Sequence, residues 1–159
     1  LYAAGGAAVA PMEALLPAAI VDGAVWRDVL KAEIGKRPDI LREIEAIVHP
    51  LVAADRAAFI AEATADILVF DIPLLFETGG DAAMDATVCV SIPDEEQAAR
   101  VLARGTMTPE QFEAIRAKQM PNAEKCARAD YVIVTDTLEH ARAQVHSVIS
   151  RIKEQLTHA

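Results

Sequence analysis

Asp71 stands where an apolar segment ends, a placement typical of residues that act beside a phosphate. The run Ile67–Phe70 has the length of a β-strand and is closed by Asp71 and Pro73. An aspartate at the carboxyl end of a buried strand can orient a magnesium ion next to a phosphate, often through water. Glu77 follows on the next loop, with room to reach the same space. The residues leave an alternative open, in which Asp71 caps a turn and Glu77 is solvated.

Three apolar residues, Leu74, Leu75 and Phe76, lie between these carboxylates in a segment that reads as a loop. Apolar side chains in a loop need a covering surface. We expect them to cover either another lobe of the protein or the apolar part of a ligand.

A second group of residues suited to phosphate lies between positions 97 and 128. This stretch carries six basic and three acidic residues, although the whole chain has a formal net charge of −9. Arg100 and Arg104 are four residues apart and share one face of a predicted helix. Arginine keeps its charge and binds phosphate through paired hydrogen bonds, and the break at Gly105 would let the segment hinge as a lid. A solvated helix face is the alternative.

The remaining reactive residue types give weaker signals. His49 is single and precedes Pro50, where a structural hydrogen bond to a carbonyl is the alternative to a functional role. Cys89 and Cys126 match no metal or redox spacing, which predicts reduced thiols and a cytoplasmic protein. We expect no metal cluster built from histidine and cysteine. No Gly-x-x-x-x-Gly-Lys-[Ser/Thr] motif, which would cradle phosphates, occurs in the sequence.

Composition limits the classes of function. The 159 residues, 53% hydrophobic and 25% charged, suit one domain with a small appended lobe. The acidic balance disfavours general nucleic-acid binding and binding to anionic membranes. No apolar stretch is long enough to span a bilayer.

The elements that would position these residues change character near Asp66. Residues 1–64 predict short helices with turns, one of them at Asp22-Gly23. Pro50 is expected to end or kink a helix before another covers 51–64. Continuous apolar runs at 67–70, 86–92 and 131–134 are typical of strands buried on both faces of a parallel sheet. Predicted helices alternate with them, one beginning at a capping box on Thr108, and this alternation indicates an α/β fold.

The order of these motifs resembles the dephospho-CoA kinase family. The segment 44–50, Ile-Glu-Ala-Ile-Val-His-Pro, is similar to the acceptor-side region of that family. The segment 71–77, Asp-Ile-Pro-Leu-Leu-Phe-Glu, is similar to its most recognisable internal motif. Gln97-x-x-Arg100-x-x-x-Arg104 and Ala129-Asp130 before the last strand follow in the same order, so the resemblance covers essentially the whole chain.

This resemblance implies that ATP phosphorylates the ribose 3′-hydroxyl of dephospho-CoA, with ATP and Mg²⁺ as cofactors. It implies a three-layer P-loop kinase-like fold, with a helical CoA-binding subdomain at 1–64, a parallel-sheet core at 65–159 and a lid at about 104–121. The implied site residues fall into three groups: Asp71, Arg100 and Arg104 for catalysis; His49, Leu74, Leu75, Phe76 and Glu77 for the acceptor; and Thr135 near the adenine.

The sequence also departs from the family pattern. Family members begin with a strand, a glycine-rich phosphate loop and a helix, and the 159 residues do not include these elements. We therefore interpret the sequence as a fragment and expect weak or no ATP binding by these residues alone. Lys118 and Cys126 stand where the family often has arginine, and Thr135 replaces a frequent asparagine.

Two other functions remain open at this point. The chain could be a noncatalytic acidic helical module that binds a partner through Leu74, Leu75 and Phe76. It could also be another nucleotide or nucleoside kinase of the same architecture. Nucleotide binding would separate the first from a kinase, and a comparison of acceptors would separate the second.

Overall fold

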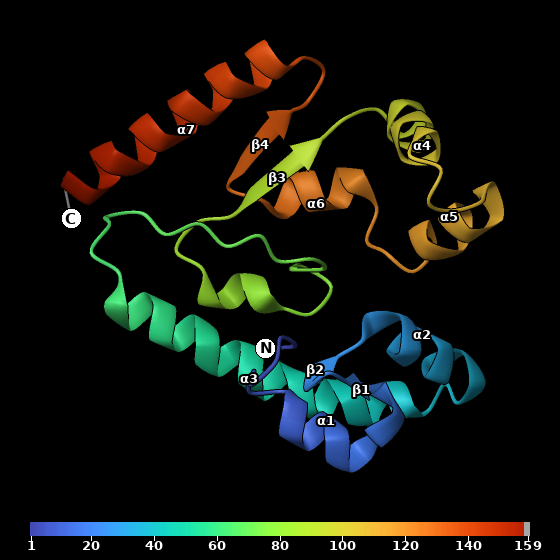
Figure 1. Cartoon of the computed structure of the whole chain (residues 1–159). Coiled ribbons are helices and arrows are strands. Elements are labelled where there is room, and N and C mark those ends of the chain that lie inside the picture. The colour runs from blue at the N-terminus through green and yellow to red at the C-terminus, as the bar shows by residue number, and fades with distance from the viewer. Residues whose placement is uncertain (158–159) are drawn as a thin grey trace. The chain divides into compact units, whose positions relative to one another are not determined.

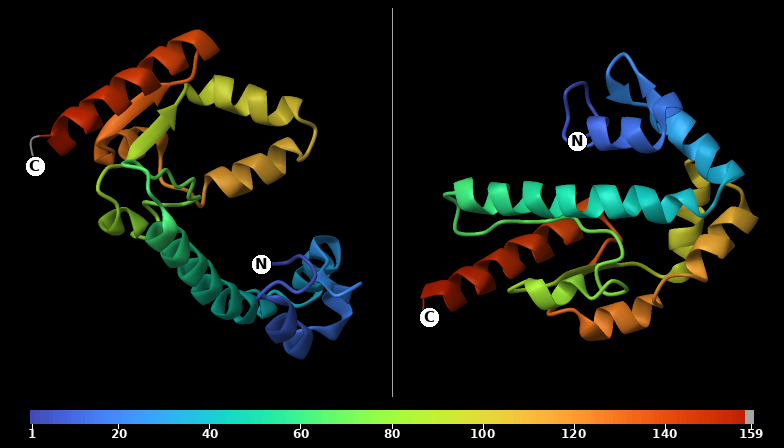
Figure 2. Two further views of the ribbon diagram at one scale, coloured as in Figure 1. Left: turned by 60° about the vertical axis from the view of Figure 1, so that its left-hand side comes forward. Right: turned by 90° about the horizontal axis from the view of Figure 1, so that it is seen from below.

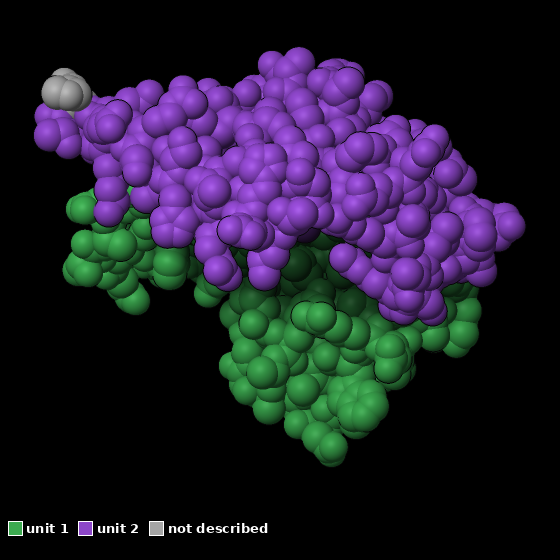
Figure 3. Space-filling model, turned by 90° about the horizontal axis from the view of Figure 1, so that it is seen from above, with its two compact units in different colours: residues 1–70 green, residues 71–159 purple. Residues whose placement is uncertain are grey.

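The structure is a computed structural model that describes residues 1–157, and it divides into two compact units. The first unit is Leu1–Phe70 and the second begins at Asp71, as the colours of Figure 3 show. The sequence-based boundary lies six residues earlier, between positions 64 and 65. Among the described residues, no helix combines the length and apolarity needed to cross a bilayer.

The first unit is helical apart from one small hairpin (Figure 1). Its elements are α1 (Val9–Leu15), a 3-10 turn (Pro17–Ala19), β1 (Ile20–Val21), β2 (Ala24–Val25), α2 (Arg27–Lys36) and α3 (Ile40–Glu62). Asp22 and Gly23 join the two antiparallel strands with φ angles of 51° and 73°. Both values are in the left-handed region, as a tight hairpin turn requires. The turn and the short broken helices follow the sequence-based expectation.

A small core holds the first unit together. Met12 of α1 and Ile40 of α3 are its largest fully buried side chains. The other buried members are Ala8, Leu16, Ala19, Val25, Leu30 and Ile44. The three helices and the hairpin therefore pack on one apolar cluster, which makes this unit compact although its only sheet among the described residues is a pair of two-residue strands.

Pro50 is expected to end or kink a helix, and the first of these outcomes, a helix end at His49, is wrong. α3 runs without interruption through Pro50 to Glu62. A proline in a helix removes the hydrogen bond to the carbonyl four residues earlier, which here belongs to Ala46. Ala46, His49 and Pro50 are all exposed. Water can therefore serve the unpaired carbonyl. Ile44 before the proline and Leu51 after it pack on the core of the first unit and hold the helix on both sides.

The expected strand at 67–70 is also absent. These residues form no regular strand, and Val69 is 85% exposed. The Phe70 ring instead packs edge-to-face on Phe59 of α3, with ring centroids 5.8 Å apart. A strand exists only through hydrogen bonds to a neighbour, and within residues 1–157 none lies alongside this segment. The apolar run is real, but nothing described here pairs with it.

The second unit has a parallel pair of strands between two helices. β3 (Val88–Ser91) and β4 (Tyr131–Val134) pair in parallel with Val88 opposite Tyr131. α6 (Asn122–Arg128) packs on β3 and α7 (Leu138–Thr157) packs on β4, on opposite faces of the sheet (Figures 1 and 2). Accordingly, Cys89 contacts α6 and Tyr131 contacts α7. This layering confirms the expected α/β class with a parallel sheet.

Two further helices, α4 (Asp94–Ala103) and α5 (Pro109–Arg116), form a helical hairpin after β3 (Figure 2). Three acidic residues in the first turn of α4 favour its start. Thr108 forms the expected capping box with Gln111, because the Gln111 N–H donates to Thr108 and the Thr108 N–H donates to Gln111. Gly105 joins the helices with a φ of 66°. A short 3-10 turn (Gly80–Ala83) precedes β3.

Candidate active site

The carboxyl ends of β3 and β4 bring together several polar groups. The Thr135 N–H donates to the Ser91 carbonyl at 2.9 Å, and the Thr135 hydroxyl donates to the same oxygen at 3.2 Å. The Asn122 amide of α6 donates to the Ser91 hydroxyl at 2.9 Å. In open parallel sheets, ligands gather beyond these strand ends. This end of the sheet is the first candidate for chemistry.

Arg100 of α4 lies at the same end. Its guanidinium donates to the Thr135 carbonyl at 2.8 Å and to the Asp136 carbonyl at 3.3 Å. It also pairs with Glu96 one turn earlier, at 2.7 Å. The side chain remains 44% exposed. Arg100 is therefore held at the strand ends by its own unit, while part of its charge still faces solvent.

Arg104 is in a different state. It is the C-cap residue of α4, and its side chain is exposed. It makes no ion pair or side-chain hydrogen bond with any other described residue. Its guanidinium has all its donors available for an anion.

Asp71 is exposed, and it too forms no ion pair or side-chain hydrogen bond with the described part of the chain. Neither arginine contacts it there. The catalytic role that the family resemblance implies for Asp71, Arg100 and Arg104 therefore stays a prediction. A carboxylate without internal partners is free to bind a hydrated cation.

The apolar segment after Asp71 folds into a tight series of turns. Leu74 has a φ of 57°, a left-handed conformation that is uncommon for leucine, and it is 44% exposed. Thr78 holds it there, because its N–H and its hydroxyl both donate to the Leu74 carbonyl, at 3.0 and 2.9 Å. Strained backbone of this kind concentrates at functional sites.

Leu75 is partly buried, and Phe76 is buried within the second unit. The Arg128 guanidinium lies 5.0 Å from the centre of the Phe76 ring and also pairs with Asp81 at 2.8 Å. Of the three apolar residues, Leu74 offers the most surface for a ligand, while Phe76 is a packing residue of the second unit.

Glu77 is occupied by contacts that the sequence does not reveal. One carboxylate oxygen accepts from the Met120 N–H at 2.9 Å and from the Lys125 ammonium at 3.0 Å. The other oxygen is buried without a partner. Burial pushes the pKa of Glu77 upward, but the bonds from Met120 and Lys125 outweigh it, and the pKa lies below its ordinary value. Glu77 is thus ionised at neutral pH.

Sequence reasoning could identify Glu77 and the basic stretch, but not this pairing, which joins residues 43 and 48 positions apart. A backbone N–H such as that of Met120 leaves no trace in residue type. Asn122 was missed for a similar reason, because its partner is the serine hydroxyl at the end of another element.

The other expected residues fall into simpler environments. His49 lies on the exposed side of α3 in the first unit. Cys89 is buried in β3, with the Cys126 sulfur 3.8 Å from its own, and both are free thiols. Burial, followed by the contact with Cys126, raises the pKa of Cys89 to about 11. At neutral pH its thiol is protonated and a poor nucleophile.

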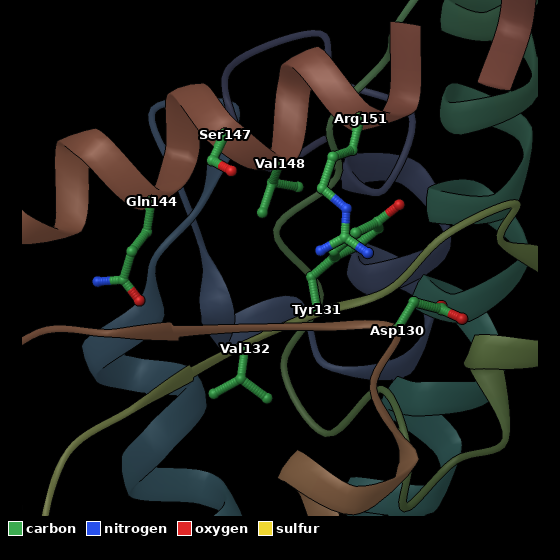
Figure 4. A pocket seen from close by; sticks show the side chains of 7 residues that line it. All are labelled: Asp130, Tyr131, Val132, Gln144, Ser147, Val148 and Arg151. Carbon is green, nitrogen blue, oxygen red and sulfur yellow. The ribbon is translucent and has the colours of Figure 1, made fainter. Parts of the chain in front are cut away.

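A shallow groove of about 220 Å³ lies between β4 and α7 (Figure 4). It is lined by Asp130, Tyr131 and Val132 on one side and by residues such as Gln144 and Arg151 on the other. The Gln144 side chain binds both the N–H and the carbonyl of Val134, at 3.0 and 2.9 Å, and so protects that part of the open strand edge. The groove flanks the first half of β4, away from the strand end that carries Thr135.

Comparisons with known proteins place the chain in a family. The family model described as "Dephospho-CoA kinase" matches residues 4–140. The chain belongs to the dephospho-CoA kinase family. A dephospho-CoA kinase from Ruegeria pomeroyi is 70% identical over 159 residues, covering the whole chain and 81% of that protein. One from Jannaschia sp. is 56% identical over 97% of the chain and 79% of its own length.

A solved structure agrees with the assignment. The crystal structure of TT1252 from Thermus thermophilus superposes with a TM-score of 0.75 at 30% sequence identity. The match covers 89% of this chain and 74% of that one. The resemblance found in the residues is therefore confirmed at the level of the dephospho-CoA kinase family and of its fold.

Proposed function

We propose that the protein transfers the γ-phosphoryl group of ATP to the ribose 3′-hydroxyl of dephospho-CoA. The observation that carries the proposal is the 70% identity to a dephospho-CoA kinase along the entire chain. A kinase needs little covalent chemistry from its side chains, because catalysis comes from positioning the reactants and stabilising the transferred charge. The site residues described above have suitable types for both tasks.

In this proposal the two arginines act differently. Arg104 has a free guanidinium, so it binds the transferring phosphate directly, with the paired geometry that arginine offers to phosphate oxygens. Arg100 is fixed to the carbonyls of Thr135 and Asp136. It adds positive charge at the strand ends and keeps the Thr135 turn, which is the segment 135–137 between β4 and α7, in place. Removal of one such charge from a phosphoryl-transfer site typically costs a large factor in rate.

The proposal assigns adenine recognition to Thr135. Its hydroxyl donates its one proton to the Ser91 carbonyl. The oxygen then remains available only as an acceptor, which suits the exocyclic amino group of adenine. A frequent asparagine at this position would supply the same kind of acceptor through its side-chain carbonyl, so the substitution preserves the chemistry.

Asp71 fits a magnesium ion that arrives with ATP. Magnesium keeps several waters and is held by one or two carboxylates together with the phosphates of the substrate. Asp71 is exposed and has no ion-pair or hydrogen-bond partner for its side chain among the described residues. Residues 1–157 hold no group of three or more His, Cys, Asp or Glu side chains that could bind a metal ion. One free carboxylate is what such a substrate-borne ion uses. The ion would neutralise charge on the phosphates during transfer.

For the acceptor, the proposal retains Leu74 as an apolar contact and His49 as a residue of the helical unit that faces solvent. Leu75, Phe76 and Glu77 support the Leu74 turn from within the second unit. We also propose that the protein acts in the cytoplasm, where thiols stay reduced, and that nucleic acid is not a substrate, given the net charge of −9.

The test is an acceptor comparison with the full-length gene product. ADP formation from ATP and Mg²⁺ would be followed with dephospho-CoA, adenosine or AMP as acceptor. We expect dephospho-CoA to be preferred by about two orders of magnitude in kcat/KM, because an acceptor site built around one substrate rejects analogues that leave it unfilled. Preference for adenosine or AMP would indicate another kinase, and no turnover with any acceptor would favour a noncatalytic interaction module.

A further inference from the structure

Two charged side chains, Arg100 and Glu77, hold the α4–α5 hairpin against other parts of the second unit. In the last turn of α4, the Arg100 guanidinium binds the carbonyls that follow β4. At the end of the hairpin, the Met120 N–H binds Glu77, which belongs to the loop that begins at Asp71. Between these points, α5 packs on α4 and makes no comparable contact with the strands among residues 1–157.

We propose that Glu77 is a positioning residue, whose carboxylate fixes the end of the α4–α5 hairpin to the loop that carries Asp71. This role rests on the proposed function, because it concerns where the hairpin holds its basic residues during phosphoryl transfer. Glu77 then touches no substrate. It acts through Met120, which lies in the segment that connects the hairpin to α6.

The surroundings of Glu77 indicate that its carboxylate holds the hairpin end through specific bonds and does not merely fill space. Its carboxylate is largely buried, with a side chain only 17% exposed, and one oxygen has no partner at all. Burial of a charged group is unfavourable unless its bonds compensate. The two bonds that do so both reach the same oxygen, one from the hairpin end and one from Lys125 of α6. An apolar residue of similar size at position 77 would pack there without the free-energy cost of burying a charge, but it would form neither bond.

The two bonds can be separated by substitution because they need different properties. The bond from Met120 requires an acceptor, whereas the ion pair with Lys125 requires opposite charges. Glu77→Gln keeps an acceptor and removes the charge. The charge swap, Glu77→Lys with Lys125→Glu, restores opposite charges but leaves no acceptor at position 77 for Met120. If Met120 is the essential contact, the glutamine variant retains more function than the swap.

A matched control exists on the same two elements. Asp81 pairs with Arg128 at 2.8 Å, so it also links the segment before β3 to α6, but it does not contact Met120. Asp81→Asn therefore removes an ion pair of the same kind and place. It is expected to leave both the hairpin and the activity unchanged.

The experiment measures amide hydrogen exchange and steady-state kinetics of the full-length protein. In Glu77→Ala we expect the Met120 amide to exchange at least about tenfold faster, while amides of β3 and β4 keep their protection. In the same variant kcat should fall about tenfold or more with a smaller change in KM, because the reactants still bind but are poorly positioned. The order of activity should be wild type, Glu77→Gln, then the charge swap and Glu77→Ala together.

Several outcomes would overturn the proposal. Unchanged Met120 exchange in Glu77→Ala would show that the bond does not hold the hairpin. Full recovery by the charge swap would assign the effect to the ion pair, and an equal loss of protection in β3 and β4 would make Glu77 a general stability residue. The exchange measurement does not depend on turnover, so it decides the anchor even if the substrate assignment fails.

Discussion

The Asp130 carboxylate and Thr87 form a closed set of hydrogen bonds at the amino ends of the two strands. One oxygen of Asp130 lies 2.7 Å from both the N–H and the hydroxyl of Thr87. The Asp130 N–H returns a bond to the Thr87 hydroxyl at 3.1 Å. Because Thr87 is buried and directly precedes β3, this contact fixes the register at which β4 begins. It joins residues 43 positions apart.

This contact predicts a dependence of stability on pH. The bonds from the Thr87 hydroxyl and N–H hold the pKa of Asp130 below its usual value of 3.8. A lowered folded-state pKa stabilises the protein above the unfolded value, and the gain is lost as the pH falls through the folded value. Urea denaturation of wild type and Asp130→Asn should therefore differ at pH 7, and the difference should shrink as the pH falls below 3.8 and through the lowered folded-state pKa. A difference that persists at low pH would contradict this cause.

The same contact can be tested from its buried side. Thr87→Val keeps the shape and removes the hydroxyl, so it should lower the free energy of unfolding by about 1–2 kcal/mol. Thr106→Val, at an exposed turn beside Gly105, is the control and should change it by less than about 0.5 kcal/mol. Chemical denaturation measures both. Equal effects in the two variants would show that the Thr87 hydroxyl adds nothing specific.

Alanine substitutions of Arg100 and Arg104 should differ in their effects on protein stability and on the catalytic rate. Arg100→Ala removes the bonds to the Thr135 and Asp136 carbonyls, so it should lower both kcat/KM and the free energy of unfolding, the latter by about 1 kcal/mol. Arg104→Ala breaks no ion pair or side-chain hydrogen bond among the described residues, so it should lower kcat/KM by about tenfold or more without changing the melting temperature. Full activity of Arg104→Ala would remove that residue from the phosphate site.

Asp71→Asn should strongly lower kcat/KM and leave the stability of the protein unchanged. Because the carboxylate is exposed and unpartnered among the described residues, the variant should melt within about 1 °C of wild type. Its kcat/KM should fall on the order of 100-fold, and added Mg²⁺ should partly restore it if the carboxylate holds the ion. A variant with wild-type activity at all Mg²⁺ concentrations would show that Asp71 only closes a turn.

Pro50 should lower the stability of α3 although it does not end the helix. Pro50→Ala restores the missing hydrogen bond and should raise the free energy of unfolding by about 1–3 kcal/mol. Pro38→Ala, in the turn before α3, frees the unfolded chain and should lower the same quantity slightly. Denaturation with urea measures both. An unchanged or lowered stability in Pro50→Ala would imply that the proline makes contacts of its own.

Cys89 should resist thiol reagents in the folded protein. With a pKa of about 11, only about one thiol in a thousand is ionised at pH 8, and the side chain is buried. Iodoacetamide should label Cys126 well before Cys89 under native conditions, with equal labelling in denaturant. Mass spectrometry of the peptides gives the order. Rapid native labelling of Cys89 would contradict its placement in β3.

The sequence predicts local structure well where neighbouring residues decide it. The capping box at Thr108, the turn at Asp22 and the strand at 131–134 all depend on residue types within a few positions, and the structure has each of them. The apolar run at 67–70 shows the limit of such reasoning, because a strand depends on a partner elsewhere in the chain. Pro50 shows another limit, since the packing of Ile44 before it and of Leu51 after it on the core of the first unit outweighs a local preference against proline.

The sequence predicts which residue types belong to the candidate site, but it does not predict which groups these side chains bind. The basic stretch and the carboxylates of 71–77 follow from charge and position in the sequence. The anchoring of Arg100 to the Thr135 turn, and of Glu77 to Met120, depends on backbone atoms that every residue carries. Only coordinates reveal which of these charged side chains are already engaged and which, like Arg104, remain available to a substrate.

The central claim concerns the position at which phosphate is added. The most direct measurement is phosphorus and proton NMR of the product formed by the full-length protein from ATP, Mg²⁺ and dephospho-CoA. The account predicts a single new phosphate monoester coupled to the proton on the 3′ carbon of the ribose. A product phosphorylated elsewhere, or dephospho-CoA recovered unchanged while the protein remains folded, would contradict it.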